Sequence, residues 1–345
     1  MQTGHLTTSK ASPPTSAQRR TSLRSGHFAL IGCVALLTAC TSQPSNSPSA
    51  GSTSSTSASS AASQATPTTV LQTSTAINPA AIPIGDGHVG TTPESGYVDS
   101  CTTSFKGRGA EHTGPWVNSS NSTWNSLTKV AVQGSVSWPS ARYSATISGS
   151  SRLIYTNDLP INHTSGIFPI SSSDPAYQYD TNPNAITAQT VNWTLPLNPI
   201  ASSSPTCLGL GPIGILNDGV LLFDALDAAG RDAGAHEVLD SCGEHPQSSG
   251  ILHHHYVPSC IVNQTSGTST LVGYAADGYG IYVERDSSGN LLSNADLDAC
   301  HGRTSTVMWN GSEQNIYHYD ATLEYPYTLG CFHGTPIQTH LAPGG

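Results

Sequence analysis

The sequence predicts a mainly β fold: a β-rich, loop-rich domain that disulfides stabilise and that contains little helix. Short segments alternate apolar with small or polar residues, Gly, Pro and Ser separate these segments, and six cysteines follow residue 40. An apolar period of two residues is typical of strands, and turn-forming residues between such segments indicate short strands joined by loops. A sustained helical period is scarce, so we expect few helices.

Four segments account for the predicted strands. They are residues 128–156, 186–195, 270–283 and 316–319. In the first segment, Val130, Val132 and Val136 alternate with small or polar residues, which indicates a strand with one buried face. Residues 231–241 are the best candidate for a helix, and the Pro- and Ser-rich residues 160–206 are expected to form long loops.

Residues 1–39 have the features of a bacterial secretory signal. Three arginines precede the apolar run FALIGCVALLT, which is too short to span a bilayer. The run ends in Leu-Thr-Ala followed by Cys40, an order that resembles the lipobox of bacterial lipoproteins. The resemblance implies that the Cys40 thiol receives diacylglycerol, which would anchor the protein to the membrane of the cell envelope. A plain secretory signal, which would leave the protein secreted without an anchor, is the alternative.

The rest of the chain divides by composition. Residues 40–84 are rich in Ser, Thr, Ala and Pro and lack an apolar period, so we expect a disordered tether between the lipid and the domain. Residues 85–206 would form a β-rich N-terminal part and residues 207–345 a second part that contains most of the histidines. The composition leaves open whether residues 85–206 are a separate domain.

The charge balance argues against nucleic acid as a partner. Only 10% of the residues are charged, and the formal net charge is −10. All four basic residues before residue 40 lie in the leader, which has no acidic residue, so the rest carries 8 basic and 22 acidic residues. Such a surface repels phosphate backbones but is compatible with divalent cations.

The cysteines fit an exported protein. Six remain once the leader residue Cys33 is removed and Cys40 is lipidated, and an even number in an exported chain indicates three disulfides with 15 connectivities. These six are Cys101, Cys207, Cys242, Cys260, Cys300 and Cys331. No CxxC spacing occurs, which argues against a zinc ribbon.

Histidines are concentrated in the C-terminal third, which holds nine of the 14. Because side chains at i and i+2 of a strand share a face, His253 and His255 would point together, and His254 would point away to the surface. In the same way His318 and Asp320 would share a face. If the two strands lay side by side, His253, His255, His318 and Asp320 would hold a divalent metal such as Zn, Cu, Fe or Mn.

A weak internal repeat supports this site and favours two of the disulfides. In each unit a Cys beside Gly and His precedes a ligand pair spaced by two residues, and a second Cys follows. If each unit closes its own disulfide, the pairs are Cys242–Cys260, Cys300–Cys331 and, by remainder, Cys101–Cys207.

Three further residues are secondary candidates for the metal site. His245 and His301 each lie beside Gly near a Cys, and Asp277 could orient a ligating imidazole or turn a tight loop. An acidic group further upstream does not match the calcium-binding loop of an EF-hand, so we expect it to lie in solvated loops. Its members are Asp218, Asp224, Asp227, Asp232, Glu237 and Asp240.

Several ordered motifs follow one another between residues 210 and 335. They are NDGV at 217–220, GEHP at 243–246, LHHH at 252–255, GYAADGYGIY at 273–282, LDACHG at 297–302, YHYD at 317–320, YPY at 325–327 and GCF at 330–332. This series resembles the YHYH-domain family, named for that tetrapeptide. The chain departs from the family at Leu252 and His254, where the family has tyrosines, and at Asp320, where the family has His. The resemblance implies a map of motifs but no reaction.

The sequence therefore predicts an exported, lipid-anchored YHYH-domain protein that binds a divalent metal, and it leaves open whether the protein is an enzyme. One alternative is a non-catalytic extracellular module that binds a glycan or an envelope protein through aromatic loops. The aromatic residues of that hypothesis are Trp309, Tyr317, Tyr319, Tyr325 and Tyr327. Another alternative is a structural envelope protein that its disulfides hold together.

Overall fold

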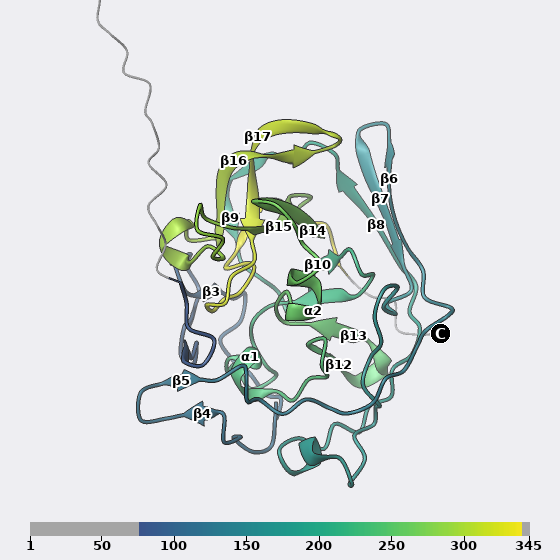
Figure 1. Cartoon of the computed structure of the whole chain (residues 1–345). Helices are drawn as coiled ribbons and strands as arrows, with labels where there is room; N and C mark the ends of the chain where they lie inside the picture. The colour runs from purple at the N-terminus through teal and green to yellow at the C-terminus, as the bar shows by residue number, and fades with distance from the viewer. Residues whose placement is uncertain (1–75, 340–345) are drawn as a thin grey trace, which may run out of the picture. The chain divides into compact units, whose positions relative to one another are not determined.

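The computed structural model describes residues 76–339, all of which belong to one compact unit (Figure 1). The predicted signal at 1–39, Cys40 and most of the predicted tether lie outside the described residues. The end of the tether needs a correction, because β1 (Ile82–Pro83) pairs with Trp124 and Thr123 and its Ile82 is buried. The folded domain therefore begins before residue 85. No helix in the described range is both long and apolar enough to cross a membrane.

The fold is mainly β, as predicted: strands make up 34% of the described residues and helices 7%. The largest sheet has eight strands in the order β12-β13-β11-β10-β14-β15-β17-β16. In chain order these are β10 (Pro212–Leu216), β11 (Leu221–Phe223), β12 (Glu244–Pro246), β13 (Leu252–His254), β14 (Ser269–Ala275), β15 (Gly280–Glu284), β16 (Gly302–Trp309) and β17 (Ser312–Asp320). The pairs β11–β13 and β15–β17 are parallel and the other pairs are antiparallel.

The middle of this sheet is covered on both faces. Every residue of β10 and β15 is buried, including the polar end of β15 at Glu284. Continuous burial, rather than alternation, is the pattern of a strand that packs against other elements on both sides. Polar side chains that point away from the apolar core of this sheet are therefore still removed from water.

Smaller sheets and short helices surround the large sheet. A three-stranded antiparallel sheet contains β6 (Tyr143–Ser148), β7 (Ser151–Thr156) and β8 (Val191–Pro196), and β1 pairs with β5 (Thr123–Trp124), which pairs with β4 (Val117–Asn118). Two-stranded sheets join β2 (Val89–Gly90) to β3 (Val98–Asp99) and β9 (Ala201–Thr206) to β18 (Phe332–Gly334). The helices are α1 (Ala233–His236), α2 (Ser259–Val262) and the 3-10 turns Pro175–Gln178, Ser248–Gly250 and Asn294–Asp296.

Contacts cross the predicted division at residue 207. Strand β9 pairs with β18, and a disulfide joins Cys101 to Cys207. The structure also pairs Cys242 with Cys260 and Cys300 with Cys331, which are the pairs that the internal repeat favoured. The first of these closes an 18-residue separation that contains all of β12 and β13.

Candidate metal centre

The neighbouring antiparallel strands β12 and β13 form a short hairpin, and each strand contributes histidines that lie close to those of the other. His245 lies opposite His253, and Glu244 lies opposite His254. Because opposed residues of an antiparallel pair point to the same face, His245 and His253 share one face, and alternation adds His255 to it. Glu244 and His254 point to the other face.

Four side chains on the first face form what we call the imidazole cluster: Glu237, His245, His253 and His255. The Nε2 atom of His245 lies 3.0 Å from that of His253 and 3.3 Å from that of His255. The Oε2 atom of Glu237 lies 2.7 Å from His245 Nε2 and 3.4 Å from His255 Nε2. All four residues are buried, with exposures between 3% and 7%.

A short helix positions the carboxylate of this cluster. Asp232 caps α1 by accepting a hydrogen bond from the backbone N–H of Ala235 at 3.2 Å. Glu237 follows the helix and donates its own backbone N–H to the carbonyl of Ala233 at 3.0 Å. The end of α1 therefore fixes the point from which the Glu237 side chain reaches the three imidazoles.

Backbone carbonyls fix the tautomers of two imidazoles. The Nδ1 atom of His255 lies 2.5 Å from the carbonyl of Asp224, and Nδ1 of His253 lies 3.4 Å from that of Ile251. Because a carbonyl only accepts, each Nδ1 carries the proton, and in its neutral form each ring turns its Nε2 lone pair toward the cluster. A second hydrogen bond of this kind is what holds the ligating imidazoles of metal sites in place.

The pKa shifts describe the charges within the cluster. Burial lowers the pKa of His255, but the contact with Glu237 and the negative charge of Glu237 raise it above its ordinary value. Burial raises the pKa of Glu237, but His245 and His255 lower it by a larger amount. The pKa of Glu237 therefore lies well below its ordinary value. Burial and the two neighbouring histidines hold the pKa of His253 well below its usual range. The cluster thus combines an ionised carboxylate with an imidazole that keeps its lone pair free at neutral pH.

The donor separations match a metal site. Ligands at 2.0–2.1 Å from a metal stand about 3.3 Å apart in a tetrahedron and about 2.9 Å apart in an octahedron. The four contacts above span 2.7 to 3.4 Å. Glu237 Oε2 is buried and accepts no hydrogen bond of acceptable geometry from the described residues. Its contact with His245 is close but poorly aligned, as expected for two donors that face a common centre.

His318 and Asp320 do not join this cluster, so the prediction of one converging site is wrong. They lie on β17, and four strands separate β17 from β13 in the sheet. At about 4.8 Å per strand the separation is roughly 24 Å, and Figure 1 shows β16 and β17 at the far end of the sheet from β12 and β13. Strand alternation was correct for each pair, but it carries no information about which strands become neighbours.

His318 and Asp320 belong to a separate ion-pair network. His318 Nε2 lies 3.2 Å from Glu284 Oε2 and 3.7 Å from Asp320 Oδ2, and Arg303 Nε lies 3.3 Å from Glu284. Burial and the charge of Glu284 raise the pKa of Asp320 well above its usual value. Donor atoms of Glu284, His318 and Asp320 lie within 4.8 Å of one another, so these residues could hold a metal of their own, although Arg303 already places a cation beside Glu284.

The secondary candidates have structural partners. His301 is buried, and its two ring nitrogens face the carbonyl of Thr328 at 2.9 Å and the hydroxyl of Thr322 at 3.1 Å. Asp277 accepts hydrogen bonds from the hydroxyl of Tyr319 and the backbone N–H of Gly334. Only His245, among the three secondary candidates, lies in the imidazole cluster.

Two predictions about exposure are wrong for a common reason. His254 is fully buried rather than exposed, because the sheet is covered on both faces at β13. The acidic group is also buried: Asp218, Asp224, Asp227, Asp232, Glu237 and Asp240. Several of these aspartates accept the backbone N–H two residues ahead, as Asp224 does from Leu226, which replaces water as the partner of the carboxylate. Glu237 was in this group, and no local pattern marked it as a ligand.

The fold and the cluster define a β-rich, disulfide-stabilised domain with a buried group of histidines. Residues 192–290 match the family model described as YHYH protein, and this segment of the chain therefore contains a YHYH domain. The matched segment contains the whole imidazole cluster and ends before β17. No curated protein and no solved structure matches the chain.

Proposed function

We propose that this YHYH-domain protein is exported, lipid-anchored and binds a divalent transition metal through Glu237, His245, His253 and His255. The observation that carries the proposal is the group of buried imidazoles of His245, His253 and His255, whose donor atoms lie within 4.8 Å of one another, together with the contact of Glu237 Oε2 with two of them. Three nitrogen donors and one carboxylate suit Zn, Mn, Fe or Cu. The site accordingly differs from the predicted one in two of its four ligands.

The same donor set is compatible with two roles for the metal. In tetrahedral coordination the four side chains fill the shell, as in structural zinc sites. In octahedral coordination two positions stay open, and a bound water there becomes acidic enough to serve as a nucleophile. In either case Asp224 and Ile251 hold the rings through their carbonyls. No reaction is assigned.

Export is supported by the cysteines. All six cysteines of the described range are paired, and disulfides persist in oxidising compartments outside the cytosol. The anchor at Cys40 rests on the leader sequence alone. Mass spectrometry of the protein from a membrane fraction tests it, because a diacylglycerol-modified N-terminus at Cys40 is expected and an unmodified N-terminus would contradict it.

The alternative of an aromatic binding surface is not supported, because the side chains proposed for it are not at the surface. All five aromatic side chains proposed for it are buried: Trp309, Tyr317, Tyr319, Tyr325 and Tyr327. Tyr327, for example, donates its hydroxyl to the buried carboxylate of Asp232 at 2.7 Å. Side chains that pack in the core present no face to a glycan, and metal binding is therefore the better-supported function.

The test is metal uptake by the full chain, expressed without a histidine tag. The protein is stripped with EDTA, dialysed against Zn(II) and analysed for bound metal. The double variant His253→Ala with His255→Ala is expected to bind one equivalent less than wild type. The exposed His112 gives the matched control, since His112→Ala should bind as much as wild type. Equal uptake by the double variant and wild type would refute the proposal.

X-ray absorption adds a readout that loss of folding does not mimic. In the loaded protein the metal at this site should have nitrogen and oxygen neighbours at about 2.0–2.2 Å. Sulfur in the coordination shell at about 2.3 Å would place the metal elsewhere in the chain.

A further inference from the structure

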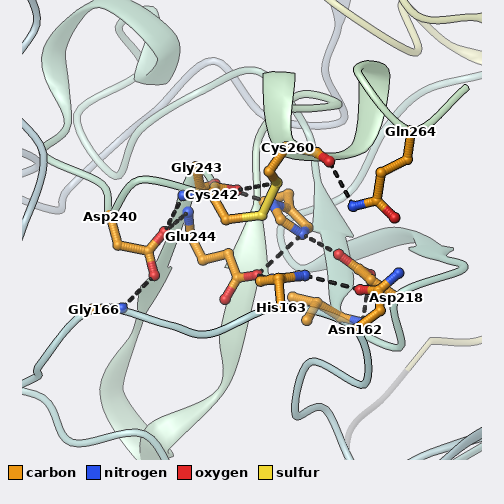
Figure 2. Close-up of a disulfide and its surroundings, with 12 residues drawn as sticks. Asn162, His163, Gly166, Asp218, Asp240, Cys242, Gly243, Glu244, Cys260 and Gln264 are labelled. Carbon is orange, nitrogen blue, oxygen red and sulfur yellow. Dashed lines mark hydrogen bonds and ion pairs between the residues drawn. A yellow bond between two sulfur atoms is a disulfide. The ribbon is translucent and has the colours of Figure 1, made fainter. Parts of the chain in front are cut away.

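The opposite face of β12 and β13 carries a second group of ligand-type side chains. Glu244 and His254 point to this face from the two strands. Asp218 reaches them from the turn between β10 and β11, and His163 from the loop that follows β7. Figure 2 shows His163, Asp218 and Glu244 close to the disulfide of Cys242 and Cys260. We call His163, Asp218, Glu244 and His254 the carboxylate–histidine cluster.

The donor atoms of this cluster are close to one another. His254 Nε2 lies 3.0 Å from Asp218 Oδ2 and 3.6 Å from Glu244 Oε1. His163 Nε2 contacts the same Oε1 atom of Glu244. One donor atom each of His163, Asp218 and Glu244 lies within 4.8 Å of the others. Glu244 and His254 are fully buried, Asp218 is nearly so, and the side chain of His163, at the rim, is 10% exposed.

The hydrogen-bond pattern leaves a place for a cation. Nδ1 of His254 donates to the carbonyl of Gly243 at 3.1 Å. The Nε2 atom of a neutral ring then points its lone pair at the carboxylate of Asp218, which is unfavourable unless a cation or a second proton lies between them. The other oxygen of Glu244, Oε2, is buried and has no hydrogen-bond partner among residues 76–339.

Two further carboxyl groups lie near the cluster. Asp158 and Asp240 are also buried nearby, but backbone N–H groups engage their oxygens. Asp240 accepts from Gly166 at 2.7 Å, and Asp158 accepts from the N–H groups at the starts of β11 and β13.

We propose that the carboxylate–histidine cluster is a second metal site, so that one strand pair holds a metal ion on each of its faces. Two imidazoles and two carboxylates form a harder donor set than the imidazole cluster, and they suit Mn, Fe or Zn. The proposal uses none of the four residues of the first site. It goes beyond the proposed function because it changes the number of metals and adds the loop of His163 to the metal-binding residues.

The experiment compares single-site variants of the full chain, stripped with EDTA and dialysed against Zn(II) or Mn(II) alone. Wild type is expected to bind two equivalents of Zn(II), and His163→Ala one. His163 is the first choice because it lies at the rim of the core, where its removal disturbs folding least. Glu244→Gln keeps the size of the side chain and should also bind one equivalent. His112→Ala is the control, and circular dichroism of the metal-free variants monitors folding.

The outcomes separate this site from the first one. If wild type binds one equivalent that His163→Ala and Glu244→Gln both retain, the cluster is a protonated histidine network and the second site is refuted, while the first stands. If those variants lose the single equivalent and His253→Ala keeps it, the proposed function fails and the second site stands. Absence of uptake by wild type refutes both.

Discussion

His301 provides a test of the fold that is independent of any metal. Its ring is buried, and burial lowers its pKa to about 4. In the unfolded chain a histidine has a pKa of about 6.5. The unfolded chain therefore takes up a proton first as the pH falls. Stability from this residue is fully present above pH 6.5 and is lost progressively as the pH falls toward 4.

The size of the effect follows from these two pKa values. Their full difference corresponds to about 3 kcal/mol, of which about 2 kcal/mol falls between pH 7.0 and pH 4.5. The perturbation is His301→Asn, because Asn tolerates the left-handed backbone at this position, where φ is 66°. Loss of the hydrogen bonds to Thr328 and Thr322 should cost the variant about 2 kcal/mol at neutral pH.

The assay is urea unfolding of wild type and variant at both pH values, with EDTA present. The stability gap between the two proteins is expected to close at pH 4.5, because only wild type carries the histidine that protonates on unfolding. A gap of equal size at both pH values would refute the assignment of His301 as a buried neutral side chain. Metal uptake by His301→Asn should equal that of wild type, since His301 lies outside both clusters.

Three further perturbations address the hairpin and its metal. Replacing Cys242 and Cys260 by serine opens the loop that contains β12 and β13 and should lower the free energy of unfolding by about 3 kcal/mol; an unchanged urea midpoint would contradict this. Asp158→Ala leaves two buried N–H groups of β11 and β13 without an acceptor and should cost about 2–5 kcal/mol, whereas a loss below 1 kcal/mol in the same assay would show that water replaces the carboxylate. Zn(II) at about 100 times its Kd should add about 2.7 kcal/mol and raise Tm by about 5–10 °C; calorimetry should find a smaller rise for His253→Ala, and equal rises would argue against His253 as a ligand.

Local patterns predicted the strand content and the facing of side chains well. Residues 270–283 cover all but the first residue of β14 and the last residue of β15, and residues 316–319 lie within β17. Alternation placed His253 with His255 and His318 with Asp320 on shared faces. Of residues 128–156, only the second half forms regular strands, β6 and β7. The first half makes isolated bridges, such as that of Val132 to Asp240, because its partners are loops.

Local sequence patterns could not predict the order of the strands in the sheet. The sheet places four strands between β13 and β17, and this order depends on contacts between segments distant in sequence. Glu237 is a further example, since its role depends on the approach of α1 to β12 and β13. Burial of His254 follows from coverage of the second face of the sheet, which a single strand's sequence does not encode.

In the pair of strands β12 and β13, whether a residue number is odd or even decides which face of the sheet its side chain joins. Odd positions 245, 253 and 255 supply nitrogen donors to one face, whereas even positions 244 and 254 supply a carboxylate and an imidazole to the other. A shift of pairing by one residue exchanges the faces of a strand. A single insertion between Gln247 and Ile251 would therefore scramble both donor sets at once, while an insertion of two residues would keep each side chain on its own face.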